Sequence, residues 1–164
     1  MANASTTGFG FRPIKMIGQS SNDAGLSEYK IAASSALISH GAMVQLTADG
    51  VVLESSNSTV NNLGVLNGIF FTDADTNKPT FANFSKASNT ATDIVAFVND
   101  DPRQMFEVMS ADTAFNQNEV GHCADQVKAD GVTPLFVSKS KISATTANSK
   151  AQLKILGVSR DPDH

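Results

Sequence analysis

The chain has little of what catalytic, metal-binding or disulfide-stabilised domains usually need. Among its 164 residues there is no Trp, one Tyr and one Cys, Cys123. A single cysteine excludes an intrachain disulfide, so stability must come from a packed core and from contacts with other subunits. With so few Trp and Tyr residues, a platform of stacked rings for carbohydrate is not expected. No cluster of Cys and His with metal-ligand spacing is visible, so no cofactor or metal is expected.

Charge is also scarce. Asp, Glu, Lys and Arg make up 17% of the chain, and the formal net charge is -4. Nucleic-acid binding needs clustered Lys and Arg, and the nearest approach to a cluster is Lys139-Ser140-Lys141. No apolar run approaches the roughly 20 residues that span a bilayer, and the first residues show no signal-peptide pattern. We therefore expect no nucleic-acid partner, no membrane partner and synthesis in the cytoplasm.

What the chain does contain is a series of short β-type segments. Residues 41–47 and 51–53 flank Asp49-Gly50, a strong hairpin signal because Gly accepts the positive φ of the turn. The apolar segment 63–71 carries Gly64 and Gly68, which suggest a β-bulge. Residues 93–98 form a buried-strand pattern, and 104–109 are predicted as the strand paired with it across the turn at 99–102.

The C-terminal third continues this pattern. Residues 111–128 are the one place where a helix is plausible, of a turn or two at most, and 135–137, 141–143 and 152–158 are predicted strands. Many short strands with regular turns indicate a sandwich or barrel. The fold class expected is therefore mainly β, a single domain over residues 1–164 with a small sandwich- or barrel-like architecture.

Residues 1–25 are predicted to form an extended N-terminal arm. Ser, Thr, Asn, Gly and Ala dominate it, and Pro13 opposes a helix. A short apolar island within it contains Phe9, Phe11 and Ile14, beside the cations Arg12 and Lys15. Exposed apolar side chains are costly on a free tail, so they either fold back on their own domain or dock on a partner. The second alternative makes these five residues the candidate binding site.

Three patterns that resemble catalytic or metal sites are better explained as structure. Asp73 and Asp75 begin a calcium-loop pattern, but Lys78 stands where Gly is needed and Phe84 where Glu is needed. His122-Cys123 are adjacent, a geometry that does not favour a thiolate–imidazole hydrogen bond. Ser138 and Ser140 alternate with Lys along a segment expected to be exposed, whereas a Ser–Lys dyad needs a desolvated Lys. We expect no catalytic residue.

Three blocks of the sequence resemble the small head-decoration (cement) proteins of tailed bacteriophages, in particular structural proteins of marine phages. They are NASTTGFGFRPI at 3–14, DPRQMFEV at 101–108 and LKILGVSRDPDH at 153–164. The spacing of the blocks is also similar, so the likeness extends over most of the chain. Relatives of this kind continue further past the Asp-Pro-Asp segment.

The resemblance implies a β-rich, β-tulip-type domain on the outer surface of the virion capsid. It also implies a homotrimer that clamps neighbouring major capsid proteins, with no catalytic residue and no cofactor. Two other hypotheses remain open from the sequence: a tail, neck or fibre-associated virion protein, and a small ligand-binding or enzymatic β domain.

Overall fold

The structure, a computed structural model, describes residues 7–18, 25–56, 61–111, 115–143 and 151–159. Its regular elements are strands and one turn of 3-10 helix, so the prediction of a mainly β domain is confirmed. In chain order the elements are β1 (Arg12–Met16), β2 (Ser27–Lys30), β3 (Met43–Leu46), β4 (Val52–Glu54), β5 (Gly64–Thr72), β6 (Pro79–Ala82), β7 (Val95–Asn99), β8 (Gln104–Glu107), η1 (Gln117–Glu119), β9 (Cys123–Ala124), β10 (Gln126–Val127), β11 (Lys141–Ile142) and β12 (Leu153–Lys154).

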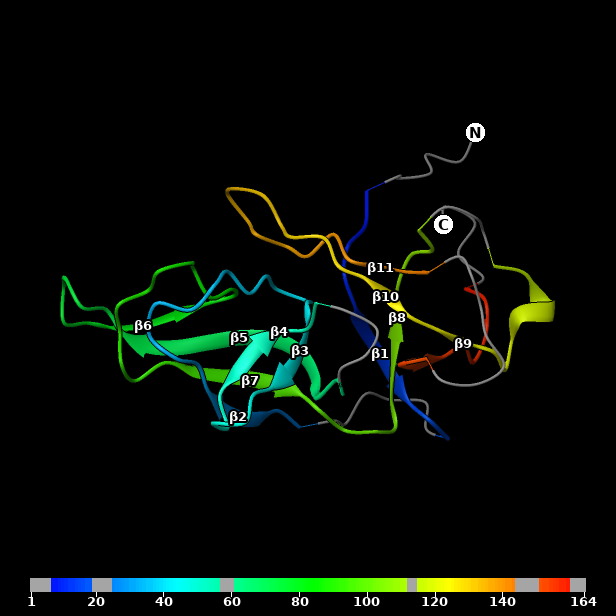
Figure 1. The fold of residues 1–164 in the computed structure, drawn as a ribbon, viewed down its shortest axis with the longest axis horizontal. Coiled ribbons are helices and arrows are strands. Elements are labelled where there is room, and N and C mark those ends of the chain that lie inside the picture. Colours follow the sequence, from blue (N-terminus) through cyan, green and yellow to red (C-terminus); the bar gives the residue numbers. More distant parts are fainter. Residues whose placement is uncertain (1–6, 19–24, 57–60, 112–114, 144–150, 160–164) are drawn as a thin grey trace.

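Strands β2 to β7 form one six-stranded sheet, in the order β2-β7-β5-β3-β4 with β6 added to β5. We call this part the sheet lobe; it lies at the left of Figure 1. Every pairing in it is antiparallel. The nine-residue β5 is its longest strand and pairs with β3, β6 and β7.

The period-two alternation of these strands directs one set of side chains to an aliphatic core. On β7, Ala96 and Val98 are fully buried, whereas Val95 and Phe97, which alternate with them, are half-buried. The core cluster also includes Val44 of β3 and Leu66 of β5. Ile, Val, Leu and Ala residues make up this cluster, and Tyr29 of β2 and Phe71 of β5 pack against it.

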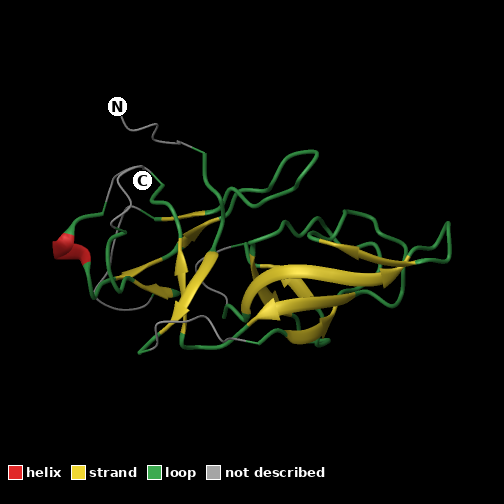
Figure 2. Ribbon diagram, turned by 180° about the vertical axis from the view of Figure 1, so that it is seen from behind, coloured by secondary structure: helices red, strands yellow, loops and turns green. Residues whose placement is uncertain are grey.

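Strands β1 and β8 to β12 form three two-stranded sheets, β1-β8, β9-β12 and β10-β11. We call this part the small-sheet lobe; its strands lie together beside the six-stranded sheet in both views (Figures 1 and 2). Its core gathers residues that are distant in sequence, namely Phe11, Met43, Val65, Ala124, Ile142 and Ile155.

Two strands of the sheet lobe supply both cores. On β3, Met43 belongs to the core of the small-sheet lobe and its neighbour Val44 to that of the sheet lobe. Val65 and Leu66 divide in the same way on β5. Neighbouring strand residues point to opposite faces of the sheet. One face therefore covers the aliphatic core, and the opposite face carries the small-sheet lobe at the end that contains Met43 and Val65.

Most predicted elements are present. Gly50 has a φ of 72° in the turn between β3 and β4, β5 has a register shift between Leu66 and Gly68, and the helix within 111–128 is the single turn η1. The predicted pairing of 93–98 with 104–109 is wrong. Strand β7 is already paired on both sides, by β2 and β5, so β8 crosses to the small-sheet lobe and pairs with β1.

The predicted arm, residues 1–25, is only partly described. Its residues 7–18 fold back on the domain, with residues 12–16 forming β1. Residues 1–6 and 19–24 lie outside the described ranges.

Candidate docking surface

The surface around β1 combines an apolar side chain with an irregular strand edge. In its pairing with β8 the register shifts between Pro13 and Lys15, so Ile14 is the extra residue of a β-bulge. A bulge turns its side chain out of the regular alternation. The side chain of Ile14 is 43% exposed, and that of Ile17, just beyond the strand, is 51% exposed. β8 is the one strand that pairs with β1 within the described residues.

The five predicted anchor residues divide between the interior and the surface. Phe11 is 2% exposed and packs edge-on against Phe106, with ring centroids 6.5 Å apart. Phe9 is half-buried, whereas Arg12, Ile14 and Lys15 are exposed. Phe11 is therefore a core residue of its own domain, and the part of the set that can meet a partner is Ile14 with its flanking cations.

Close backbone approach, rather than flexibility, is the role of the glycines before β1. A Cβ on Gly8 would lie 2.2 Å from the backbone oxygen of Lys139. A Cβ on Gly10 would lie 2.6 Å from the backbone oxygen of Gly41, and Gly10 also has a φ of 73°. Both positions therefore exclude a side chain, and this lets Phe11 reach the core while its amide donates to Gly41.

Arg12 ties the N-terminal segment to β8. Its guanidinium forms an ion pair and hydrogen bond with Glu107, and its carbon Cζ lies 5.3 Å from the centroid of the Phe9 ring. The hydroxyl of Ser159 donates to the other oxygen of Glu107 at 2.8 Å. Strand β1 and the segment that follows β12 therefore meet at one carboxylate of β8.

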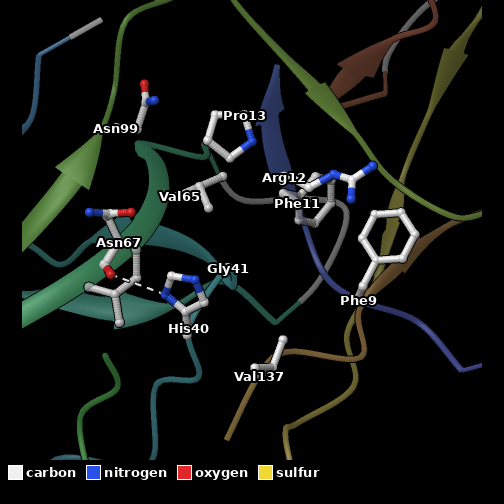
Figure 3. A pocket seen from close by; sticks show the side chains of 11 residues that line it. Phe9, Phe11, Arg12, Pro13, His40, Gly41, Val65, Asn67, Asn99 and Val137 are labelled. Carbon is white, nitrogen blue, oxygen red and sulfur yellow. Dashed lines mark hydrogen bonds between the residues drawn. The ribbon is translucent and has the colours of Figure 1, made fainter. Parts of the chain in front are cut away.

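A pocket of about 340 Å³ lies between the N-terminal segment and the sheet lobe. Its wall is mainly apolar, with Phe9 on one side and His40 and Asn67 on the other (Figure 3). Nδ1 of His40 lies 3.0 Å from the backbone oxygen of Asn67, so this nitrogen carries the proton and donates it. Asn67 is the bulged residue of β5, and its carbonyl is therefore free to accept from His40.

Ile17, which is exposed, and His40, which is half-buried, were not part of the predicted binding site. Ile17 lies three residues after Ile14, where the predicted apolar island ends, and its apolar side chain so close to that island was the available signal. His40 had no such signal, because its partner Asn67 is 27 residues away and becomes available only through the bulge.

The three patterns set aside as catalytic or metal sites occupy structural positions. Asp73 accepts hydrogen bonds from the amide and hydroxyl of Thr76 and from the amide of Asp75, which keeps its pKa below the usual value. Ser138 and Ser140 are buried, not exposed as expected, because their hydroxyls contact the backbone of Ala129. Cys123 is half-buried in β9.

A buried carboxylate links the two lobes. Glu54 at the end of β4 lies 3.5 Å from the ammonium of Lys128, which also lies 3.3 Å from Asp130. Neither carboxylate oxygen of Glu54 accepts a hydrogen bond within the described structure. Burial raises the pKa of Glu54 to about 7 against the opposing effect of Lys128, because one long ion pair does not compensate for lost hydration.

Comparison with known proteins gives no relative. No protein-family model, no curated protein and no solved structure matches the chain. Among the described residues, no three His, Cys, Asp or Glu side chains form a group that could hold a metal ion. None of the helices in the described ranges has the length and apolar character to cross a membrane.

Proposed function

We propose that this chain is a virion structural protein that binds the outer surface of a bacteriophage capsid and stabilises contacts between major capsid proteins. The observation that carries the proposal is the bulge at Ile14, which presents an apolar side chain beside Arg12 and Lys15 on the surface of a β domain. The resemblance of residues 3–14, 101–108 and 153–164 to head-decoration proteins supplies the identity of the partner.

The geometry favours anchoring by side chains over addition of a partner strand. Pro13 has no amide hydrogen, and the bulge at Ile14 interrupts the regular spacing of donors and acceptors along β1. A partner strand would find few consecutive hydrogen bonds on this edge. An apolar recess on the capsid can instead accept Ile14 and Ile17, and acidic groups at its rim can meet Lys15.

The composition fits a protein that works by packing against neighbours. A surface with few charges loses less hydration free energy when another protein covers it. In a homotrimer that engages three equivalent capsid sites, weak single contacts add up to binding on the order of 10²-fold stronger than one contact. Modest anchors such as Ile14 are therefore sufficient for stable attachment.

The test is binding of the purified chain to expanded heads that lack it, measured by co-sedimentation. Ile14→Asp should weaken binding by about tenfold or more, because a charge replaces an apolar anchor in each copy. Leu46→Asp is the matched control, since Leu46 is also 43% exposed but lies on β3 in the sheet lobe. Circular dichroism should give the parent spectrum for both variants.

A deletion of residues 1–12 is not a clean test, because it removes Phe11 from the core. Equal binding by the parent, Ile14→Asp and Leu46→Asp would show that β1 does not contact the head. Absence of binding by the parent protein itself would overturn the proposed function.

A further inference from the structure

One face of the six-stranded sheet carries the small-sheet lobe at one end. Met43 and Val65 on this face pack into the small-sheet lobe. Further along the same face the register places Phe97 of β7 opposite Gly68 of β5, and Phe70 opposite Val95. These four residues are half-buried, and none of them belongs to either core cluster. We call this part the bare face; it consists of Glu28, Lys30, Gly68, Phe70, Phe81, Val95 and Phe97.

Aromatic side chains dominate the bare face. Phe81 of β6 lies with its ring centroid 4.8 Å from that of Phe70 and 6.5 Å from that of Phe97, and it is 74% exposed. Three contacting Phe rings on the outside of a sheet form an apolar patch of the kind that marks a protein interface. In a solvated outer face of an antiparallel sheet, polar residues are expected at these positions.

Two opposite charges lie at the edge of this patch. On β2, Glu28 pairs with Phe97 and Lys30 with Val95, so both charged side chains are on the bare face. Both are exposed. They are two residues apart along the strand, a separation of about 7 Å. A pair of this kind is self-complementary. When a second copy is rotated by 180°, the Glu of each copy faces the Lys of the other.

The register arranges the bare face in two rows across the strands. One row contains Glu28, Phe97 and Gly68, and the other contains Lys30, Val95 and Phe70. Consider a two-fold axis that lies in the interface, perpendicular to the strands and midway between the two rows. It places the first row of one copy on the second row of its partner, and the second row on the first. We propose that a second copy of this chain docks face to face on the bare face about this axis.

The same axis satisfies charge and shape together. It brings Glu28 of one copy to Lys30 of the other, twice over. It also places the large Phe70 over Gly68, which has no side chain, and Phe97 over the smaller Val95. An isologous contact requires such self-complementarity, and face-to-face sheets pack in this way about 10 Å apart. The charge pairs fix the register, and the rings supply the buried apolar area.

This inference does not rest on the proposed function, because it uses none of the residues around β1. A three-fold association through another surface is compatible with it, and the two together give an even number of copies. The result of the head-binding experiment above therefore leaves the present one unaffected.

The test is a charge exchange followed by sedimentation velocity at low salt over a roughly hundredfold range of protein concentration. Glu28→Lys places Lys against Lys at both contacts, and Lys30→Glu places Glu against Glu. Each variant alone should associate about tenfold or more weakly than the parent. An equimolar mixture of the two variants should recover association, since every contact between unlike chains is then Lys against Glu.

The double variant Glu28→Lys/Lys30→Glu should also associate as the parent does. Lys154→Glu, which reverses an exposed charge on β12, is the control and should have no effect. Phe81→Ser should weaken association without altering the charge pattern. A monomeric parent, single variants that associate normally, or a mixture that fails to recover would each overturn the proposal.

Discussion

The two lobes are built from the chain in different ways. The core cluster of the sheet lobe extends from Ile31 to Val98 and comes from one continuous part of the sequence. The core of the small-sheet lobe extends from Phe11 to Ile155 and includes Met43 and Val65 on strands of the other lobe. A core assembled from remote segments closes longer loops and so loses more chain entropy on folding. Its strands are also paired only in twos, so the small-sheet lobe is expected to be the less stable of the two.

The strongest test of this difference is removal of Phe11. Phe11→Ala should lower the free energy of unfolding by about 3–4 kcal/mol, because it removes a large, buried ring and leaves a cavity. Amide hydrogen exchange should speed up in β1 and β8, whereas β5 and β7 keep most of their protection. Urea unfolding and exchange measured by mass spectrometry give the two readouts.

Leu66→Ala is the comparison in the sheet lobe. Leu66 is fully buried in the aliphatic core, and its truncation should cost a similar free energy but raise exchange in both lobes, because β5 supplies both cores. If Phe11→Ala also raises exchange evenly throughout the chain, the two lobes unfold as one unit and the comparison fails.

A glycine tests how tightly the N-terminal segment is held. Gly10→Ala should cost about 2–3 kcal/mol, because it adds a Cβ against a backbone oxygen at a residue with positive φ. Gly18 separates the two causes: its φ is 79°, but a Cβ there meets nothing within 4 Å. Gly18→Ala should therefore cost only about 1 kcal/mol, the backbone part alone. Equal losses in thermal unfolding would remove the steric argument.

The contact between the lobes should depend on pH through Glu54. Its pKa rises from 4.5 in the unfolded chain to about 7 in the folded one, so between these values the folded state binds more protons. The neutral Glu54 carboxyl therefore contributes to the free energy of unfolding. This contribution is fully present below pH 4.5 and is lost as the pH rises through about 7. Complete ionisation, reached near pH 8, should cost about 3 kcal/mol, of which about 2 kcal/mol is lost between pH 5 and pH 8.

Glu54→Gln is the test, because Gln keeps the shape and cannot ionise. Its stability relative to the parent should increase by about 2 kcal/mol from pH 5 to pH 8 in urea unfolding. Lys128 lies between Glu54 and Asp130, and Asp130 also raises the pKa of Glu54, so Asp130→Asn measures the share of Asp130. A constant difference between Glu54→Gln and the parent across this range would mean that Glu54 is ionised throughout.

The sequence predicted the sheet lobe better than the small-sheet lobe for a physical reason. Turns such as Asp49-Gly50 and the apolar run of β5 are local signals. The partner of β8 is not local: Glu107 meets Arg12 across 95 residues of chain. The sequence located the candidate site only in part: composition showed that the segment from Phe9 to Lys15 is apolar and cationic. Which of those side chains face inward depended on the bulge and on Gly41, and neither can be read from the segment itself.

The smallest effect is expected at the ion pair between Arg12 and Glu107. The Arg12 side chain is 56% exposed, so water and salt screen the charges, and Arg12→Ala should lower the free energy of unfolding by less than about 1 kcal/mol. A double-mutant cycle with Glu107→Ala measures the coupling between the two side chains. If the apolar core holds the N-terminal segment, as the burial of Phe11 indicates, this coupling is a minor part of the loss seen for Phe11→Ala. A coupling as large as that loss would mean instead that charge, and not packing, fixes β1 on the small-sheet lobe.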